Sequence, residues 1–139
     1  QNINQMILLF NYQQRVVLDI EPNIFFDIDQ NSFPSIIINL FENAIKYSAS
    51  DTIITIGLKQ QNGKIILSVK DEGVGISEKN KQHLFEKFYR IGNEETRKTK
   101  GTGLGLYIVK KIVDNAGGKI ELESELNKGT SFSVFLKVE

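Results

Sequence analysis

One segment of the sequence carries four polar side chains whose spacing suits the binding of a charged ligand. They stand at positions i, i+4, i+7 and i+8 of a predicted helix: Asn39, Asn43, Lys46 and Tyr47. This spacing places them on one face of an α-helix. Two amides and an ammonium on one face are suited to hold a metal ion and a polyphosphate. A solvated helix face shows the same pattern, so this segment alone leaves both interpretations open.

A glycine-rich run, DEGVGI, follows a predicted strand at residues 71–76. The strand end would fix Asp71, while Gly73 and Gly75 expose backbone without side chains. A carboxylate in this position is able to accept a hydrogen bond from a planar base that lies against the glycines. An ordinary strand-to-helix turn is the alternative, and the run by itself does not decide between them.

Three alternating glycines precede another predicted helix, in the segment GTGLGL at residues 101–106. Glycines let backbone amides approach a ligand closely, and a helix N-terminus attracts phosphate. One glycine would suffice for a turn, so three favour phosphate binding. The preceding residues 90–100 hold four basic and two acidic side chains, a net charge of 4 − 2 = +2, which suits an anionic small ligand. The spacing matches neither the P-loop nor the dinucleotide-binding glycine pattern.

The overall charge and composition exclude several classes of protein. Among 139 residues, 17 basic side chains balance 17 acidic ones, so strong electrostatic attraction to nucleic acid or to an anionic membrane is not expected. The chain has no cysteine, which excludes a thiolate zinc site, an iron–sulfur cluster and a cysteine nucleophile. The single histidine, His83, has no second ligand nearby in the sequence and is expected on the surface of a short helix. We predict no nucleic-acid partner and no membrane contact.

Hydrophobic periodicity predicts the elements that must position these residues. Helices are expected at residues 2–14, 32–45, 77–84 and 104–116. Strands are expected at residues 15–20, 24–28, 52–60, 64–71, 119–123 and 130–138. The polar residues 91–103 are predicted to form a loop. This order is consistent with helices packed on one face of a sheet.

Four segments in a fixed order carry a resemblance to a known family. They are NLFENAIKYS (39–48), DEGVGI (71–76), FEKFYR (85–90) and GTGLGL (101–106). Together they resemble the N, G1, F and G2 boxes of sensor histidine kinases, in the ATP-binding domain shared with gyrase, ninety-kilodalton heat-shock chaperones and mismatch-repair ATPases. The resemblance covers residues 15–138, and four boxes in this order are far more specific than any one of them.

The resemblance implies an α+β fold, a two-layer sandwich in which about three helices lie on one face of a mixed, mostly antiparallel sheet of about five strands. It also implies an ATP-binding domain at residues 15–139, with residues 91–103 as the ATP lid. Residues 1–14 would then be a short helix that ends the connection from a dimerisation and phosphoacceptor domain absent from this sequence. We expect this chain to be a monomer and to face the cytoplasm.

The resemblance also implies roles for individual residues toward ATP and Mg²⁺. Asn43 would ligate the metal, Lys46 would contact phosphate, and Tyr47 would pack near the nucleotide. Asp71 would accept from the adenine amino group, with Thr130 beside the base. The remaining residues expected to bind the nucleotide are Gly73, Gly75, Ile76, Lys100, Gly101, Thr102, Gly103, Leu104, Gly105 and Leu106. The candidate catalytic residues are Asn39, Glu42, Lys46 and Arg90, of which the last would position the γ-phosphate.

Two features bear on the reaction that the resemblance implies. Asn39 stands where the gyrase and chaperone branch has a glutamate that activates water, and an amide cannot act as a general base. His83 does not lie in a phosphoacceptor motif, so the histidine substrate would belong to a separate helical domain, with a response regulator as an indirect partner. The leading hypothesis is a histidine kinase catalytic domain. A related serine kinase of the anti-sigma type, an ATPase, and a degenerate nucleotide-binding module used for protein contact remain as alternatives.

Overall fold

The computed structural model describes residues 16–22, 32–49, 51–86 and 104–137. In chain order, the elements of this part are β1 (Val16–Ile20), α2 (Ser32–Lys46), β2 (Ile54–Gln61), β3 (Lys64–Asp71), α3 (Glu78–Lys81), α4 (Gly105–Asn115), β4 (Lys119–Glu125) and β5 (Gly129–Lys137). The predicted helix 2–14, strand 24–28 and loop 91–103 lie outside the described residues. The other predicted elements are confirmed, with ends that shift by a few residues.

The five strands form one mixed sheet in the order β1-β2-β3-β5-β4. Only β1 and β2 run parallel, and the other neighbouring pairs are antiparallel. The expected mostly antiparallel sheet is therefore confirmed. Between β2 and β3, Asn62 and Gly63 both have positive φ angles, of 54° and 76°. These values are typical of the two-residue turn that an Asn-Gly pair favours in a hairpin.

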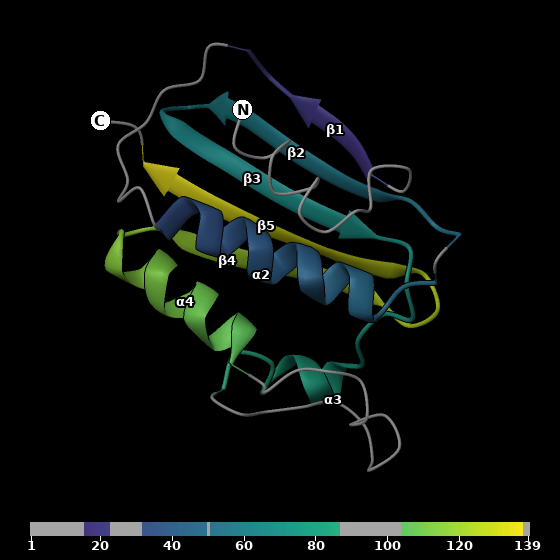
Figure 1. Cartoon of the computed structure of the whole chain (residues 1–139). Helices are drawn as coiled ribbons and strands as arrows, with labels where there is room; N and C mark the ends of the chain where they lie inside the picture. The colour runs from purple at the N-terminus through teal and green to yellow at the C-terminus, as the bar shows by residue number, and fades with distance from the viewer. Residues whose placement is uncertain (1–15, 23–31, 50, 87–103, 138–139) are drawn as a thin grey trace.

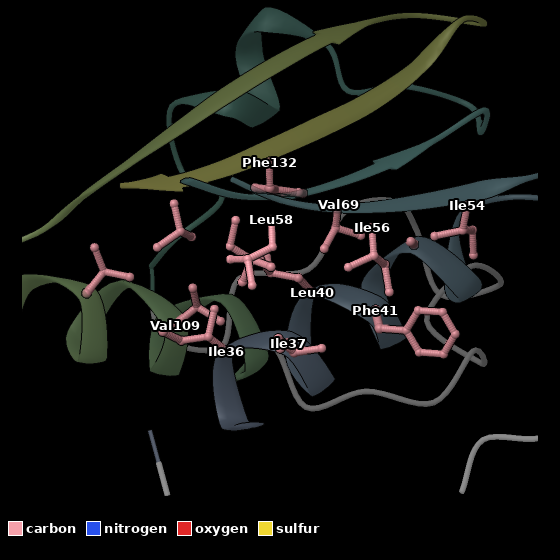
Figure 2. Close-up of a cluster of buried hydrophobic side chains, with 14 of the residues drawn as sticks. Ile36, Ile37, Leu40, Phe41, Ile54, Ile56, Leu58, Val69, Val109 and Phe132 are labelled. Carbon is pink, nitrogen blue, oxygen red and sulfur yellow. The ribbon is translucent and has the colours of Figure 1, made fainter. Parts of the chain in front are cut away.

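The hydrophobic core lies between the sheet and the helices α2 and α4, which cover the same face of the sheet (Figure 1). In Figure 2, side chains of α2 and Val109 of α4 face the side chains of the strands. The α2 residues at this interface follow the helical period: Ile36, Ile37, Leu40, Phe41 and Ala44. The strands supply every second residue, because alternate side chains of a strand point to the same face. The half-buried flank of α2 beside this stripe carries the polar residues of the candidate site.

The short helix α3 begins as the sequence predicts. The side chain of Ser77 accepts a hydrogen bond from the backbone N–H of Asn80 at 3.3 Å, which satisfies one of the amides that a helix start leaves unpaired. After α3, the half-buried ring of Phe85 meets the buried ring of Phe132 edge to face, with 6.1 Å between ring centroids. The aromatic segment at residues 85–90 thus starts as part of the core. None of the helices in the described ranges is long and apolar enough to cross a membrane.

Candidate functional site

Asp71 is a buried carboxylate at the C-terminal end of β3. Its relative exposure is only 4%, and its Oδ1 accepts a hydrogen bond from the backbone N–H of Gly73 at 2.8 Å. Burial of a charged group is costly unless hydrogen bonds compensate for the lost water. A carboxylate accepts about four hydrogen bonds, and the bond from Gly73 N–H is one of them. This arrangement fixes a strong acceptor at the strand end.

The two glycines after Asp71 are required by close backbone packing. A Cβ atom on Gly73 would overlap the carbonyl oxygen of Tyr47, which accepts a hydrogen bond from Val74 N–H at 3.2 Å. A Cβ atom on Gly75 would overlap the carbonyl oxygen of Glu125, and Gly75 has a φ of +76°. The loop is therefore fixed between the end of α2 and the β4–β5 turn. Glycine at both positions is thus required by the fold itself.

A row of three polar side chains crosses the sheet at this end. Asp71 of β3 is paired in register with Thr130 of β5, which in turn is paired with Ser124 of β4. Thr130 is 6% exposed, and its Oγ1 lies 2.8 Å from Ser124 Oγ. The same Ser124 oxygen accepts a hydrogen bond from Ile76 N–H at 2.8 Å. Ser124 therefore joins the loop that follows Asp71 to the strand that carries Thr130.

Ser124 was not predicted as a site residue, although the sequence of β4 carries a signal for it. Along β4, Ile120, Leu122 and Ser124 alternate with exposed glutamates. Ser124 therefore occupies an inward position that would ordinarily be apolar. A hydroxyl at such a position needs a hydrogen-bond partner. The sequence of β4 therefore predicts a hydrogen bond between the Ser124 hydroxyl and another buried polar group.

The polar face of α2 forms the second part of the site. Asn39 and Asn43 are half-buried one turn apart, whereas Glu42 is exposed. The Asn39 amide nitrogen donates to the Ser35 carbonyl oxygen at 2.8 Å, and a Cβ atom on Gly105 would lie 3.1 Å from Asn39 Oδ1. The oxygen of Asn39 thus faces the first turn of α4. The predicted shared face brings Asn39 to the start of the glycine-led helix.

Lys46 and Tyr47 stand at the C-terminal end of α2. The Lys46 ammonium lies 5.5 Å from the centroid of the Tyr47 ring, within the range of a cation–π contact. Both residues are half-buried. Because the Tyr47 carbonyl contacts the loop at Gly73 and Val74, this end of α2 adjoins the Asp71 part of the site. Helix α2 therefore connects the two parts.

Helix α4 starts without electrostatic repulsion toward an anion. Its N-cap residue, Leu104, makes no side-chain capping hydrogen bond, and its first turn contains no acidic residue. Backbone N–H groups and the helix dipole at such an end favour phosphate. Leu106 packs against the core and anchors this turn. The other predicted residues of this part lie outside the described residues: Arg90, Lys100, Gly101, Thr102 and Gly103.

The described residues contain no group of three or more His, Cys, Asp or Glu side chains that could hold a metal ion. A site of that composition would suit a tightly held structural cation. Mg²⁺ instead keeps several waters and is commonly bound through one or two protein oxygens together with substrate phosphates. The amide of Asn43 is half-buried one turn along α2 from Asn39, whose oxygen faces the start of α4, and a single amide oxygen fits that mode of binding.

Comparison with known proteins places this arrangement in a family. Residues 28–139 match the family described as histidine kinase-, DNA gyrase B- and HSP90-like ATPase. The sensor protein RprX of Bacteroides fragilis is 39% identical over 78% of this chain and 21% of its own length. The sensor histidine kinase YkoH of Bacillus subtilis is 38% identical over 88% of this chain and 27% of its own length. The chain therefore spans about a quarter or less of these relatives.

Solved structures agree with the family match. The catalytic domain of the histidine kinase ThkA superposes with a TM-score of 0.80 and 28% identity, over 98% of this chain and 91% of that one. The chain belongs to the family of histidine kinase-, DNA gyrase B- and HSP90-like ATPases, is a nucleotide-binding domain of that family, and has sensor histidine kinases as its relatives.

Proposed function

We propose that this domain binds ATP with Mg²⁺ and donates the γ-phosphoryl group to a histidine on a separate helical domain. The observation that carries the proposal is the buried carboxylate of Asp71, fixed by Gly73 N–H at 2.8 Å and paired in register with Thr130. Adenine presents an exocyclic amino group, which is a hydrogen-bond donor. A buried acceptor at a strand end beside close-packed glycine backbone is complementary to that edge of the base.

The two parts of the site match the two ends of the nucleotide. With the base at Asp71, the phosphates would extend along the polar face of α2 toward the start of α4. Lys46 would neutralise phosphate charge, and Asn43 would hold Mg²⁺, which when bound supplies further neutralisation of that charge. Phosphoryl transfer depends mainly on positioning and charge neutralisation. At the phosphate end, Arg90 would position the γ-phosphate. Lys100, Gly101 and Gly103 would also bind the nucleotide there.

The chemistry of α2 favours a kinase over a hydrolase. The Asn39 side chain is an amide whose nitrogen is committed to the Ser35 carbonyl at 2.8 Å, and it has no basic site with which to activate water. Glu42 is exposed on the helix, where it would be a candidate for contact with the acceptor domain. The nucleotide would then be retained until an acceptor arrives.

The acceptor is proposed to come from outside this chain. The only histidine, His83, has 45% of its side chain exposed and pairs with Glu86 at 2.8 Å, three residues away. The relatives are several times longer than this chain, which leaves room in such proteins for a helical dimerisation and phosphoacceptor domain. A response regulator would receive the phosphoryl group from that domain. We propose that the catalytic domain itself is monomeric and faces the cytoplasm, where ATP is available.

A phosphotransfer assay tests the proposal. The chain is incubated with Mg²⁺ and radiolabelled ATP, with and without the helical domain of the parent protein supplied separately. We expect label on the helical domain only, in the acid-labile and base-stable form of phosphohistidine. Acid-stable phosphoserine would favour the serine kinase alternative, and rapid release of phosphate without an acceptor would favour the ATPase. Failure to bind any adenine nucleotide would favour the protein-contact module.

Substitution of Asn43 by alanine is expected to remove the contribution of Mg²⁺ to binding. Calorimetry would give the Kd of the ATP analogue AMPPNP with Mg²⁺ and with a chelator. We expect Mg²⁺ to lower the Kd of the native chain for AMPPNP. In Asn43→Ala the factor by which Mg²⁺ lowers the Kd should be about 10-fold smaller, which is equivalent to about 1.4 kcal/mol. Asn115→Ala, at an exposed position at the end of α4, is the matched control. An unchanged Mg²⁺ effect in Asn43→Ala would remove the metal role of this residue.

A further inference from the structure

The hydroxyl of Ser124 makes three hydrogen-bonding contacts at once. Its oxygen lies 2.8 Å from Ile76 N, 3.0 Å from the Gly129 carbonyl oxygen and 2.8 Å from Thr130 Oγ1. It belongs to none of the four family segments, and the roles proposed so far do not use it. The contacts connect β4, β5 and the loop that begins at Asp71. These contacts restrict the directions in which the hydroxyl protons of Ser124 and Thr130 can point.

The direction of each hydrogen bond follows from counting donors and acceptors. A serine hydroxyl has one proton and two lone pairs. The N–H of Ile76 only donates, so it takes one lone pair. The carbonyl of Gly129 only accepts, so it takes the single proton of Ser124. The contact with Thr130 must therefore use the second lone pair of Ser124, and Thr130 is the donor.

The opposite direction would cost a contact. If Ser124 donated to Thr130, its proton would no longer reach the Gly129 carbonyl oxygen at 3.0 Å. Gly129 is buried, and a Cβ atom there would overlap the Asp71 carbonyl oxygen. Loss of a hydrogen bond to a buried polar group is unfavourable. The arrangement in which Thr130 donates to Ser124 and Ser124 donates to Gly129 is therefore favoured, because it keeps all three hydrogen bonds of Ser124.

We propose that Ser124 is a positioning residue for base selection, because it fixes Thr130 as a hydrogen-bond acceptor toward the ligand. With its proton directed at Ser124, Thr130 presents only lone pairs beside the carboxylate of Asp71. Two neighbouring acceptors favour a purine with an amino group at position 6. They disfavour a purine with a carbonyl oxygen at that position, as in guanine. This inference rests on the proposed function, since it places the base at Asp71.

The experiment measures the preference for adenine rather than affinity alone. Calorimetry on the whole chain would give the Kd values of ADP and GDP for the native protein, Ser124→Ala and Ser124→Thr. In Ser124→Ala the hydroxyl of Thr130 is released and can donate to the carbonyl of guanine. We expect the ratio of the GDP Kd to the ADP Kd to fall about 3- to 10-fold, the effect of one hydrogen bond. Ser124→Thr keeps the hydroxyl and should hold the ratio within about 2-fold of native.

Two further variants make the result specific. Ser133→Ala removes a hydroxyl from the opposite face of β5 and should leave the ratio unchanged. Thr130→Val should lower the ratio by itself, and addition of Ser124→Ala to it should have no further effect, since Ser124 acts through Thr130. If Ser124→Ala does not fold, Thr130→Val with Ser124→Thr still tests the acceptor role.

The outcomes separate this inference from the proposed function. If Ser124→Ala weakens ADP and GDP equally, or changes neither, Ser124 has only a structural role and the inference is wrong while nucleotide binding stands. If the native chain binds neither nucleotide, the proposed function fails and the inference fails with it. If the ratio of the GDP Kd to the ADP Kd falls in Ser124→Ala but stays near the native value in Ser124→Thr, the result supports both the inference and the proposed function.

Discussion

Asp71→Asn is expected to weaken ADP binding by about 100-fold and to leave the fold intact. The asparagine oxygen can still accept the hydrogen bond from Gly73 N–H that Asp71 Oδ1 accepts at 2.8 Å. The asparagine NH₂ group, however, would face the amino group of adenine, so that a donor meets a donor. Loss of a hydrogen bond to a charged acceptor costs about 1.5–3 kcal/mol, and a 100-fold change corresponds to about 2.7 kcal/mol. Calorimetric titration with ADP measures the effect.

A change of ligand distinguishes this cause from general damage to the site. Inosine diphosphate carries a carbonyl oxygen at position 6, which an asparagine NH₂ group can meet as a donor. Asp71→Asn should therefore bind inosine diphosphate more tightly relative to ADP than the native chain does. Asp51→Asn, at an exposed position, is the matched control and should bind as native. Equal loss of both nucleotides with a lowered melting temperature would show that Asp71 is structural and does not contact the base.

Local patterns allowed most of the fold to be predicted. The helices α2 and α4 and the β2–β3 hairpin were found from periodicity and turn residues, because each is fixed by contacts close in sequence. The start of α3 at Ser77 was found for the same reason. Order along the chain then revealed the family. The roles of the predicted site residues stay predictions, although Asp71 and Thr130 are in register and Asn39 adjoins Gly105.

The contacts that shape the site could not be predicted, because they join distant segments. Ile76 N–H bonds to Ser124, 48 residues away, and no local pattern indicates this pairing. Asn39 and Gly105 meet only because α2 and α4 pack together on the sheet. Gly75 was identified as part of a glycine-rich loop. The reason for glycine at that position, its contact with the Glu125 carbonyl, is visible only in the folded chain.

Gly75→Ala is expected to be among the most destabilising single substitutions in the domain. Gly75 has a φ of +76°, which costs a non-glycine residue about 1–2 kcal/mol. The added Cβ atom would also overlap the carbonyl oxygen of Glu125, and forced displacement of packed atoms costs about 1–3 kcal/mol. The sum is about 2–5 kcal/mol, a large part of the total stability of about 5–15 kcal/mol that is usual for a domain. Denaturant unfolding of the variant and the native chain measures it.

Gly63→Ala separates the two causes, because Gly63 has the same φ of +76° but no atom within 4 Å of the added Cβ. Gly63→Ala should lower the free energy of unfolding only by the strain of the positive φ angle, about 1–2 kcal/mol. The difference between the two variants then measures the contact between the Asp71 loop and the β4–β5 turn. Since Ile76 and Ser124 lie at the same junction, Gly75→Ala should also weaken ADP binding, whereas Gly63→Ala should not. Equal destabilisation by the two substitutions would mean that the β4–β5 turn yields to the methyl group, and that the loop is not fixed from that side.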